Sequence, residues 1–389
     1  MKKKIIFLLQ SSGFQSTVKI TLSGLLSILI GQALSKIFEK EWVFFLAFGI
    51  VFIVFIVVTL IFEHVAVNFN ISKIIEKDLK DKKYKSVIRL AYPLSRPLWI
   101  AGKYDLRIKL GRQVLTALNS LTEDTLLLDD KKVSVEELKA RILIDDLGWT
   151  IFRTNMYSEE CIANIEEGII IAEEEQLYPI AVKGHRHLIG IYDKLGNKVK
   201  IDENISKARD LCNSDIYKKK VSAKERESVI KGLDYALLKI QIERYKEENS
   251  SDTAILDSFI SQINSLSNYY KTEEDWERYA KTFYVKSDIL MLYNQRAKDV
   301  EAVNILQEGL NVCDEQARND GYIRIAINLM ILKNKQILSI KNDKDEKARL
   351  IKEFKEYYRD AMKRAKEINN KEHIHKLKEL LTNVGKRKI

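Results

Sequence analysis

The hydrophobic pattern of the first seventy residues differs from that of the rest of the chain. Residues 42–62 read WVFFLAFGIVFIVFIVVTLIF and contain no charged residue. An α-helix of this length rises about 30 Å, which matches the hydrocarbon core of a bilayer. The run therefore predicts a transmembrane helix and a chain that is anchored in a membrane.

A weaker apolar segment, residues 18–37, precedes this run, and only residues 38–41 separate the two. Small residues recur at every fourth position of this segment, namely Ser23, Ser27, Gly31 and Ser35. Such a stripe lets two helices pack closely inside lipid. We therefore expect a transmembrane hairpin over residues 18–64, with the stripe as its packing face. An amphipathic helix on the membrane surface is the alternative for the first segment.

Basic residues flank the predicted hairpin on both sides. Lys2, Lys3 and Lys4 precede it, and lysines recur through residues 65–90, which we expect to form a basic juxtamembrane helix. The positive-inside rule then places both termini in the cytoplasm, with residues 1–17 as a cytoplasmic segment at the inner cell membrane. The opening MKKKIIFLLQ has too short an apolar run for a signal peptide, so we expect no cleavage.

Beyond the hairpin, apolar residues recur at intervals of three and four, as in Leu233, Ala236, Leu237 and Ile240. This spacing is typical of amphipathic α-helices. The whole chain has only 3 prolines in 389 residues, far below the usual ~5%. Residues 91–389 are therefore expected to form an all-α domain.

Two distant segments of this domain repeat one another. Residues 160–174 read ECIANIEEGIIIAEE, and residues 301–315 read EAVNILQEGLNVCDE. They align without a gap and share a Glu-Gly pair and several apolar positions. Small residues in the first copy, Cys161, Gly168 and Ala172, fall on nearby turns of a helix, where a neighbouring helix must approach closely.

This pattern resembles the second helix of a tetratricopeptide repeat. The preceding Leu147-Gly148-Trp149 resembles part of the first helix, and Pro179 suits the start of the next pair. The resemblance covers residues 140–212 and 272–340, although the strict Trp-x2-Leu-Gly-x2-Tyr phrase is missing and the repeats run nearer forty residues. It implies an α-solenoid whose concave surface binds a peptide or protein. The residues that first helices would present inward are Asn155, His185, Arg186 and Tyr192, our candidates for partner binding.

Motifs of catalysis and cofactor binding were not found. No GxxxxGK[ST], GxGxxG, GxSxG or HExxH phrase occurs, so we expect a protein that is not an enzyme and needs no cofactor. The adjacent acids Asp145-Asp146 are read as solvated or capping charges.

Two histidine pairs and three cysteines also fail to predict a metal site. His185-x-His187 and His373-x-His375 would point to different sides of a helix, so we expect solvent-exposed histidines there. Cys161, Cys212 and Cys313 stand far apart without a CxxC pair, which suits a reducing cytosol.

The formal net charge of +10 and the pI near 9.1 raise the question of nucleic-acid binding. Basic residues cluster in 217–224 and 385–389, but lysine is mixed with nearly as much acid and no nucleic-acid-binding motif is visible. The pattern disfavours nucleic acid as a partner.

Two functions from different classes therefore stay open. In the first, the protein is a membrane-anchored interaction, scaffold or sensor module that docks a cytosolic protein or peptide at the inner membrane. In the second, resembling two-span bacterial defence effectors in architecture, the hairpin forms a homo-oligomer and disrupts the bilayer when the repeat domain senses a trigger.

Overall fold

A computed structural model describes residues 72–128, 130–155, 158–316, 318–340, 343–368 and 370–385. The two predicted membrane spans and their packing residues Ser23, Ser27, Gly31 and Ser35 lie outside this set, so the anchor stays a prediction from the sequence. Within the described ranges, no helix has both the length and the apolar character needed to cross a membrane. The chain divides into two compact units, residues 1–80 and 81–389, and in the first unit residues 72–80 are helical.

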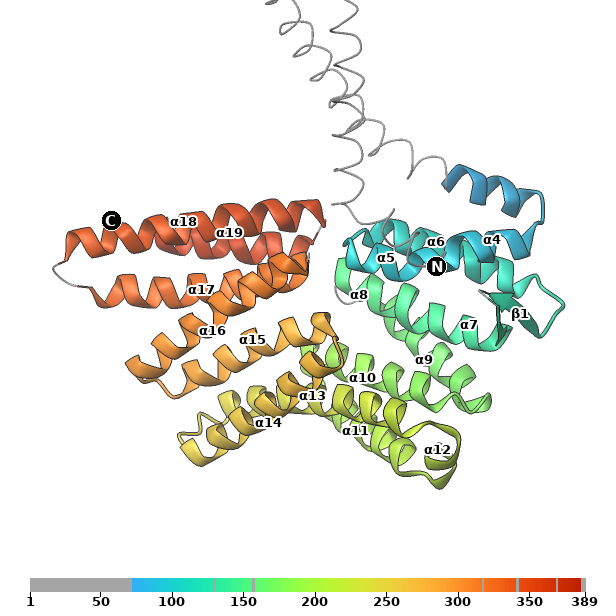
Figure 1. Cartoon of the computed structure of the whole chain (residues 1–389), viewed down its shortest axis with the longest axis horizontal. Helices are drawn as coiled ribbons and strands as arrows, with labels where there is room; N and C mark the ends of the chain where they lie inside the picture. The colour runs from blue at the N-terminus through green and yellow to red at the C-terminus, as the bar shows by residue number, and fades with distance from the viewer. Residues whose placement is uncertain are drawn as a thin grey trace, which may run out of the picture. The chain divides into compact units, whose positions relative to one another are not determined.

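The second unit is almost entirely helical, as the sequence predicted (Figure 1). Its helices are α4 (Tyr84–Ala91), the 3-10 turn η1 (Tyr92–Leu94), α5 (Ser95–Ile100), α6 (Tyr104–Asn119), α7 (Val135–Arg141), the π-helix η2 (Ile142–Trp149), α8 (Thr150–Asn155), α9 (Glu159–Glu174), α10 (Tyr178–Lys194), α11 (Lys198–Asn213), α12 (Asp215–Lys220), α13 (Ala223–Glu247), α14 (Thr253–Thr272), α15 (Trp276–Leu292), α16 (Arg296–Glu315), α17 (Asn319–Ser339), α18 (Lys344–Glu367) and α19 (Lys371–Gly385).

Helices that follow one another along the chain pack against one another. In the first stretch of the array α9 packs on η2, α10 on α9 and α11 on α10, while α15 to α18 repeat this arrangement (Figure 1). Apart from α18, these helices lie in the two stretches, 140–212 and 272–340, in which the sequence predicted helix pairs. The architecture is therefore helical-repeat-like.

The repeated segments occupy equivalent places in this packing. Cys161 of α9 and Ala302 of α16, at the same position of the two repeated segments, are fully buried. A Cβ atom added to Gly168 would lie 2.7 Å from Cγ1 of Ile144, and one added to Gly309 would lie 2.8 Å from Cβ of Phe283. Both glycines thus permit the close approach of the preceding helix, which confirms the predicted reason for the small residues.

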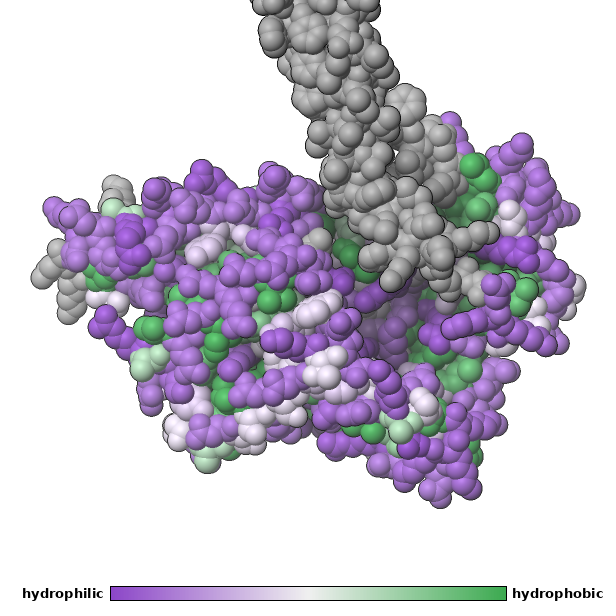
Figure 2. All heavy atoms as spheres, in the orientation of Figure 1, coloured by the Kyte–Doolittle hydropathy of each residue, from purple (hydrophilic) through white to green (hydrophobic). Residues whose placement is uncertain are grey.

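The faces of single helices explain why they pack in this way. In α18, Leu350, Phe354, Ala361 and Ala365 recur at helical spacing and are buried, while most other positions are charged or polar. Figure 2 shows the outcome over the visible face of the described residues, where hydrophilic residues dominate and apolar residues appear in smaller patches among them. Burial of this apolar stripe is the main force that holds such a helix in place.

Local signals fix the ends of several helices. The Ser158 hydroxyl accepts the backbone N–H of Cys161 and caps α9, and Ser222 caps α13 in the same way. Pro179 lies in the first turn of α10, as the sequence predicted, because that turn needs no backbone N–H donor there. Gly196 follows α10 with a φ of +67°, a conformation that favours glycine.

Two features departed from the regular α-helices that the sequence predicted. Strands β1 (Thr125–Leu128) and β2 (Lys131–Ser134) form an antiparallel hairpin between α6 and α7. Residues Ile142–Trp149 form a π-helix rather than an α-helix, and the Thr150 hydroxyl donates to the Asp145 carbonyl at its end, 2.7 Å away. A π-turn holds an extra residue, so it changes which side chains share a face.

Ion pairs join the early helices to the late ones. Arg153 of α8 is buried, and its Nη2 lies 2.7 Å from Oδ1 of Asp320 in α17. His373 of α19 and Arg324 of α17 contact the same carboxylate, at 3.2 and 3.1 Å. These contacts link the α5–α8 region to the α15–α19 region.

Candidate functional site

A cavity of about 460 Å³ lies among α5, η2, α10, α13 and α15. Its lining comes from stretches far apart in the sequence, which places it inside the helical array. The lining residues are Tyr92, Pro93, Ser95, Arg96, Trp99, Arg107, Arg141, Ile142, Asp145, Asp146, Trp149, Lys183, Arg186, His187, Ile189, Gly190, Asp193, Gly232, Tyr235, Ala236, Lys239, Ile240, Asp275, Glu277, Arg278 and Lys281. A volume of this size is typical of sites for small ligands.

The lining is rich in charge and has a positive excess. Eight arginine or lysine side chains and five carboxylates face the cavity, together with four tyrosine or tryptophan rings. The buried members of this set, such as Arg107 and Asp146, must each find a partner or bear a desolvation cost. The hydrogen bonds and ion pairs of each charged group therefore show which groups stabilise the fold and which are left to bind a ligand.

One wall of the cavity is a closed hydrogen-bonded network around Asp146. Arg107 Nη2 lies 2.7 Å from Oδ1 of Asp146, and the Ser95 hydroxyl donates to the same oxygen at 2.7 Å. Arg107 also donates to the hydroxyls of Thr150 and Ser95. Burial raises the pKa of Asp146 to about 6, although Arg107 opposes this shift. All of these groups have hydrogen-bond or ion-pair partners within the protein, which indicates that the network stabilises the fold.

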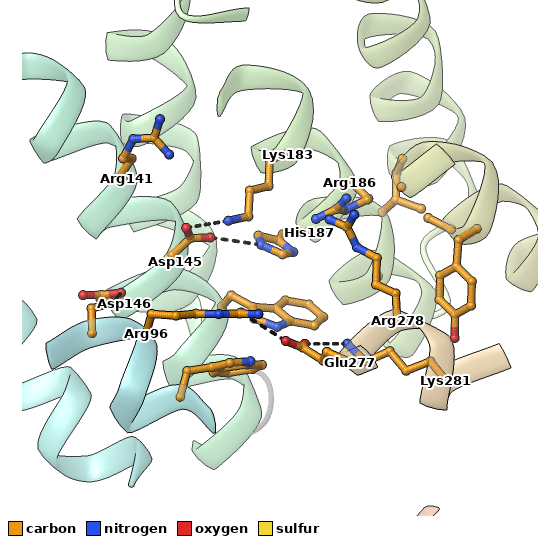
Figure 3. A pocket seen from close by; sticks show the side chains of 18 of the residues that line it. Arg96, Arg141, Asp145, Asp146, Lys183, Arg186, His187, Glu277, Arg278 and Lys281 are labelled. Atoms are coloured by element: carbon orange, nitrogen blue, oxygen red, sulfur yellow. Dashed lines mark hydrogen bonds and ion pairs between the residues drawn. The ribbon is translucent and has the colours of Figure 1, made fainter. Parts of the chain in front are cut away.

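A second network surrounds Asp145, the neighbouring acid. Lys183 Nζ lies 2.6 Å from its Oδ2, and His187 Nε2 lies 3.4 Å from its Oδ1 (Figure 3). Burial alone would raise the pKa of Asp145, but Lys183 and His187 hold that pKa well below its usual range. Burial lowers the pKa of His187 to about 3, so its ring is neutral at pH 7. That ring stacks on Trp149 with centroids 4.4 Å apart.

A third network closes the cavity between α5 and α15. Glu277 lies between Arg96, at 3.0 Å, and Lys281, at 2.9 Å (Figure 3). Burial would raise the pKa of Glu277, but these two cations hold it below its usual range. This carboxylate therefore ties an early helix to a late one across the cavity.

Two guanidinium groups stand apart from these networks. Arg186 of α10 and Arg278 of α15 point toward one another in the cavity (Figure 3). Burial, together with the positive charge of Arg278, lowers the pKa of Arg186 to about 10. The Arg186 guanidinium therefore stays charged at pH 7 and is repelled by the positive charge of Arg278.

Of the four candidate residues that the sequence suggested, one lines this cavity. Arg186 does so, whereas His185 is buried and bonds Asn204 and Glu173, at 2.8 and 3.3 Å. Tyr192 is also buried, and its hydroxyl donates to Glu166. Asn155 is the last residue of α8.

Two interpretations of charged residues were wrong. His185, His187 and His373 are buried and hydrogen-bonded rather than exposed, and of the two pairs only His375 lies at the surface. Asp145 and Asp146 are partnered within the array rather than solvated. The reason is the same in both cases: a polar group can enter a helix interface when a partner on another helix satisfies it.

Arg278, Trp149 and the two aspartates line the cavity, although none of them was among the predicted binding residues. One local signal was present, because ILIDDLGW inserts two acids into an otherwise apolar run of a buried helix. Among the described residues, no cluster of three His, Cys, Asp or Glu side chains could hold a metal ion.

Comparisons with known proteins leave the chain without a family. No family model matches it, and no curated protein matches it. A solved structure described as a circular tandem repeat protein with novel repeat topology and enhanced subunit contact surfaces aligns with 95% of this chain and 96% of its own. The identity is 12% and the TM-score is 0.23, a level at which the likeness bears on neither fold nor function.

Proposed function

We propose that the protein is a non-catalytic binding module, anchored at the inner membrane by its N-terminal hairpin. In this proposal its helical-repeat domain binds an anionic ligand, or an anionic segment of a cytosolic protein or peptide partner, in the cavity. The observation that carries the proposal is the positive excess of the lining together with two guanidinium groups that point toward one another. Membrane attachment rests on the apolar run at residues 42–62.

The arrangement of hydroxyls and bases in the cavity supports binding rather than catalysis. The Ser95 hydroxyl is held by Asp146 and Arg107, and the Thr150 hydroxyl donates to a carbonyl. His187 is a weak base, because burial lowers its pKa to about 3. A nucleophile activated by a base requires a free hydroxyl or thiol next to a base that titrates near neutral pH.

An effector role is the second candidate, and one observation favours it. The cavity is lined by α5, η2 and α10 on one side and by α13 and α15 on the other, with Glu277 bridging the two. A ligand that contacts both groups of helices would favour one distance between the two groups. A sensor domain that controls an oligomerising hairpin needs a shape change of this kind.

The test compares expression of the full chain with that of its variants in cells. Affinity capture with quantitative mass spectrometry should retain the same partners for the wild type and for Arg359→Glu, an exposed arginine on α18. Arg278→Glu should lose them, because a carboxylate there would repel an anionic segment. Identical capture by Arg278→Glu and the wild type would contradict the proposed site.

Two further measurements separate the candidate roles. The full chain should sediment with membranes, and a chain that starts at residue 71 should not. A membrane-potential dye should report no depolarisation on expression of the full chain if the hairpin is a tether. Depolarisation by the full chain alone would instead support the effector role.

A further inference from the structure

The guanidinium group of Arg186 lies against α13 at Gly232, where no side chain fills the space. A Cβ atom on Gly232 would collide with Nη1 of Arg186, so the glycine makes room for the guanidinium. No hydrogen bond or ion pair of Arg186 occurs within the described part of the chain. A half-buried arginine held in place without a carboxylate is costly unless a ligand supplies the anion.

Arg278 faces Arg186 with only a weak partner of its own. Its Nη1 lies 3.3 Å from Oδ2 of Asp275, the residue that also caps the start of α15. Its guanidinium carbon lies 5.7 Å from the centroid of the Tyr270 ring. This single contact with a local carboxylate leaves most of the donors of the guanidinium fork unused.

A third cation, Lys239, lies on the same face of α13. It follows Gly232 by two helical turns, or about 10 Å along the axis. In the described ranges Lys239 makes no ion pair. By contrast, Arg107, Lys183 and Lys281 in the same cavity each lie within 3.0 Å of a carboxylate. Among the cations of the lining, Arg186 and Lys239 are thus without an ion pair in the described ranges, and Arg278 has only its contact with Asp275.

We propose that Arg186 and Arg278 form the binding site for the phosphate group of a small organic phosphate. The phosphate lies between the two guanidinium forks, and Lys239 lies within the length of a small molecule from it. The Trp149 and Trp99 rings in the lining provide apolar surface for the organic part. This inference rests on the proposed function, because it takes the cavity to be the binding site and names the class of its ligand.

Charge and volume favour a phosphate over a carboxylate-bearing peptide. The lining carries three more basic than acidic groups, and a phosphate monoester brings about −1.5 to −2 charges at pH 7 where a carboxylate brings one. Guanidinium forks bind phosphate oxygens in pairs, which suits two arginines that face each other. About 460 Å³ accommodates a small molecule more readily than a folded peptide segment.

The test uses the full chain, purified in mild detergent, with inorganic phosphate, adenosine monophosphate, adenosine and a short glutamate peptide as probes. Calorimetry and thermal melting should show binding of both phosphates and a larger effect of phosphate than of acetate at equal ionic strength. Adenosine should bind far more weakly than its monophosphate. Arg186→Gln should weaken the binding of the monophosphate at least tenfold, and Arg186→Lys should weaken it less, because it keeps the charge and loses the fork.

Controls separate loss of the site from loss of the fold. Arg359→Gln removes an exposed arginine and should bind like the wild type, and the melting temperature without ligand shows whether each variant is folded. Equal effects of phosphate and acetate, or wild-type binding by Arg186→Gln, would overturn the inference. Binding of the glutamate peptide without any binding of phosphates would overturn the inference and leave the proposed function standing.

Discussion

Gly168→Ala tests whether the repeated small residues set the spacing between helices. The added methyl group would lie 2.7 Å from Cγ1 of Ile144 and 3.1 Å from the carbonyl oxygen of Ala140. Carbon atoms in contact prefer about 3.5–4.0 Å, so α9 must move away from η2 or the core must deform. Such overpacking costs about 1–3 kcal/mol, against which alanine gains up to about 1 kcal/mol in helix propensity. We expect a net loss of about 1–2 kcal/mol in the free energy of unfolding.

Gly190→Ala is the matched control, because Gly190 lies in the interior of the neighbouring helix α10. Its added Cβ would meet the Trp149 ring at 3.6 Å, an ordinary contact distance. This variant should be as stable as the wild type or more stable by up to about 1 kcal/mol. Urea unfolding of the full chain, followed by circular dichroism, measures both. Equal stability of Gly168→Ala and Gly190→Ala would refute the close-approach argument.

Two further substitutions test the charged networks. Burial lowers the pKa of His187 to about 3 from the ordinary 6.5, so the stability that the neutral ring contributes is complete above pH 6.5 and is lost as the pH falls. The difference in the free energy of unfolding between wild type and His187→Gln should therefore decrease by about 2 kcal/mol from pH 7 to pH 5. A constant difference in urea unfolding would contradict a neutral buried ring. Arg107→Gln should cost about 3 kcal/mol, because it leaves the buried carboxylate of Asp146 without its cation, while the exposed Arg359→Gln should change unfolding by less than about 0.5 kcal/mol.

The helical architecture could be predicted because its signals are local. The spacing of apolar residues, the scarcity of proline, Pro179 at a helix start and the Glu-Gly repeat at Gly168 and Gly309 each act within one helix or between neighbours. Such signals can be recognised in the sequence without any knowledge of distant contacts. The prediction of helix pairs over residues 140–212 therefore agreed with η2–α8, α9, α10 and α11.

Departures from that prediction arise where tertiary contacts override local preference. The apolar segment ILIDDLGW carries two adjacent acids and was expected to form an ordinary α-helix, yet it forms a π-helix whose acids contact α5, α6 and α10. The buried histidines show the same effect, since Nε2 of His373 bonds the carboxylate of Asp320, 53 residues away in the sequence. A pattern within one helix cannot reveal a partner on another helix.

The position of the cavity depends on the same long-range contacts. Arg186 was a candidate because a first helix of a repeat presents it inward, but Arg278 carried no comparable signal in the sequence. The two arginines meet because α13 places Gly232 beside Arg186 and because α15, which carries Arg278, packs against α13 and α14. The site is thus a product of how the array closes around itself, rather than of any one repeat.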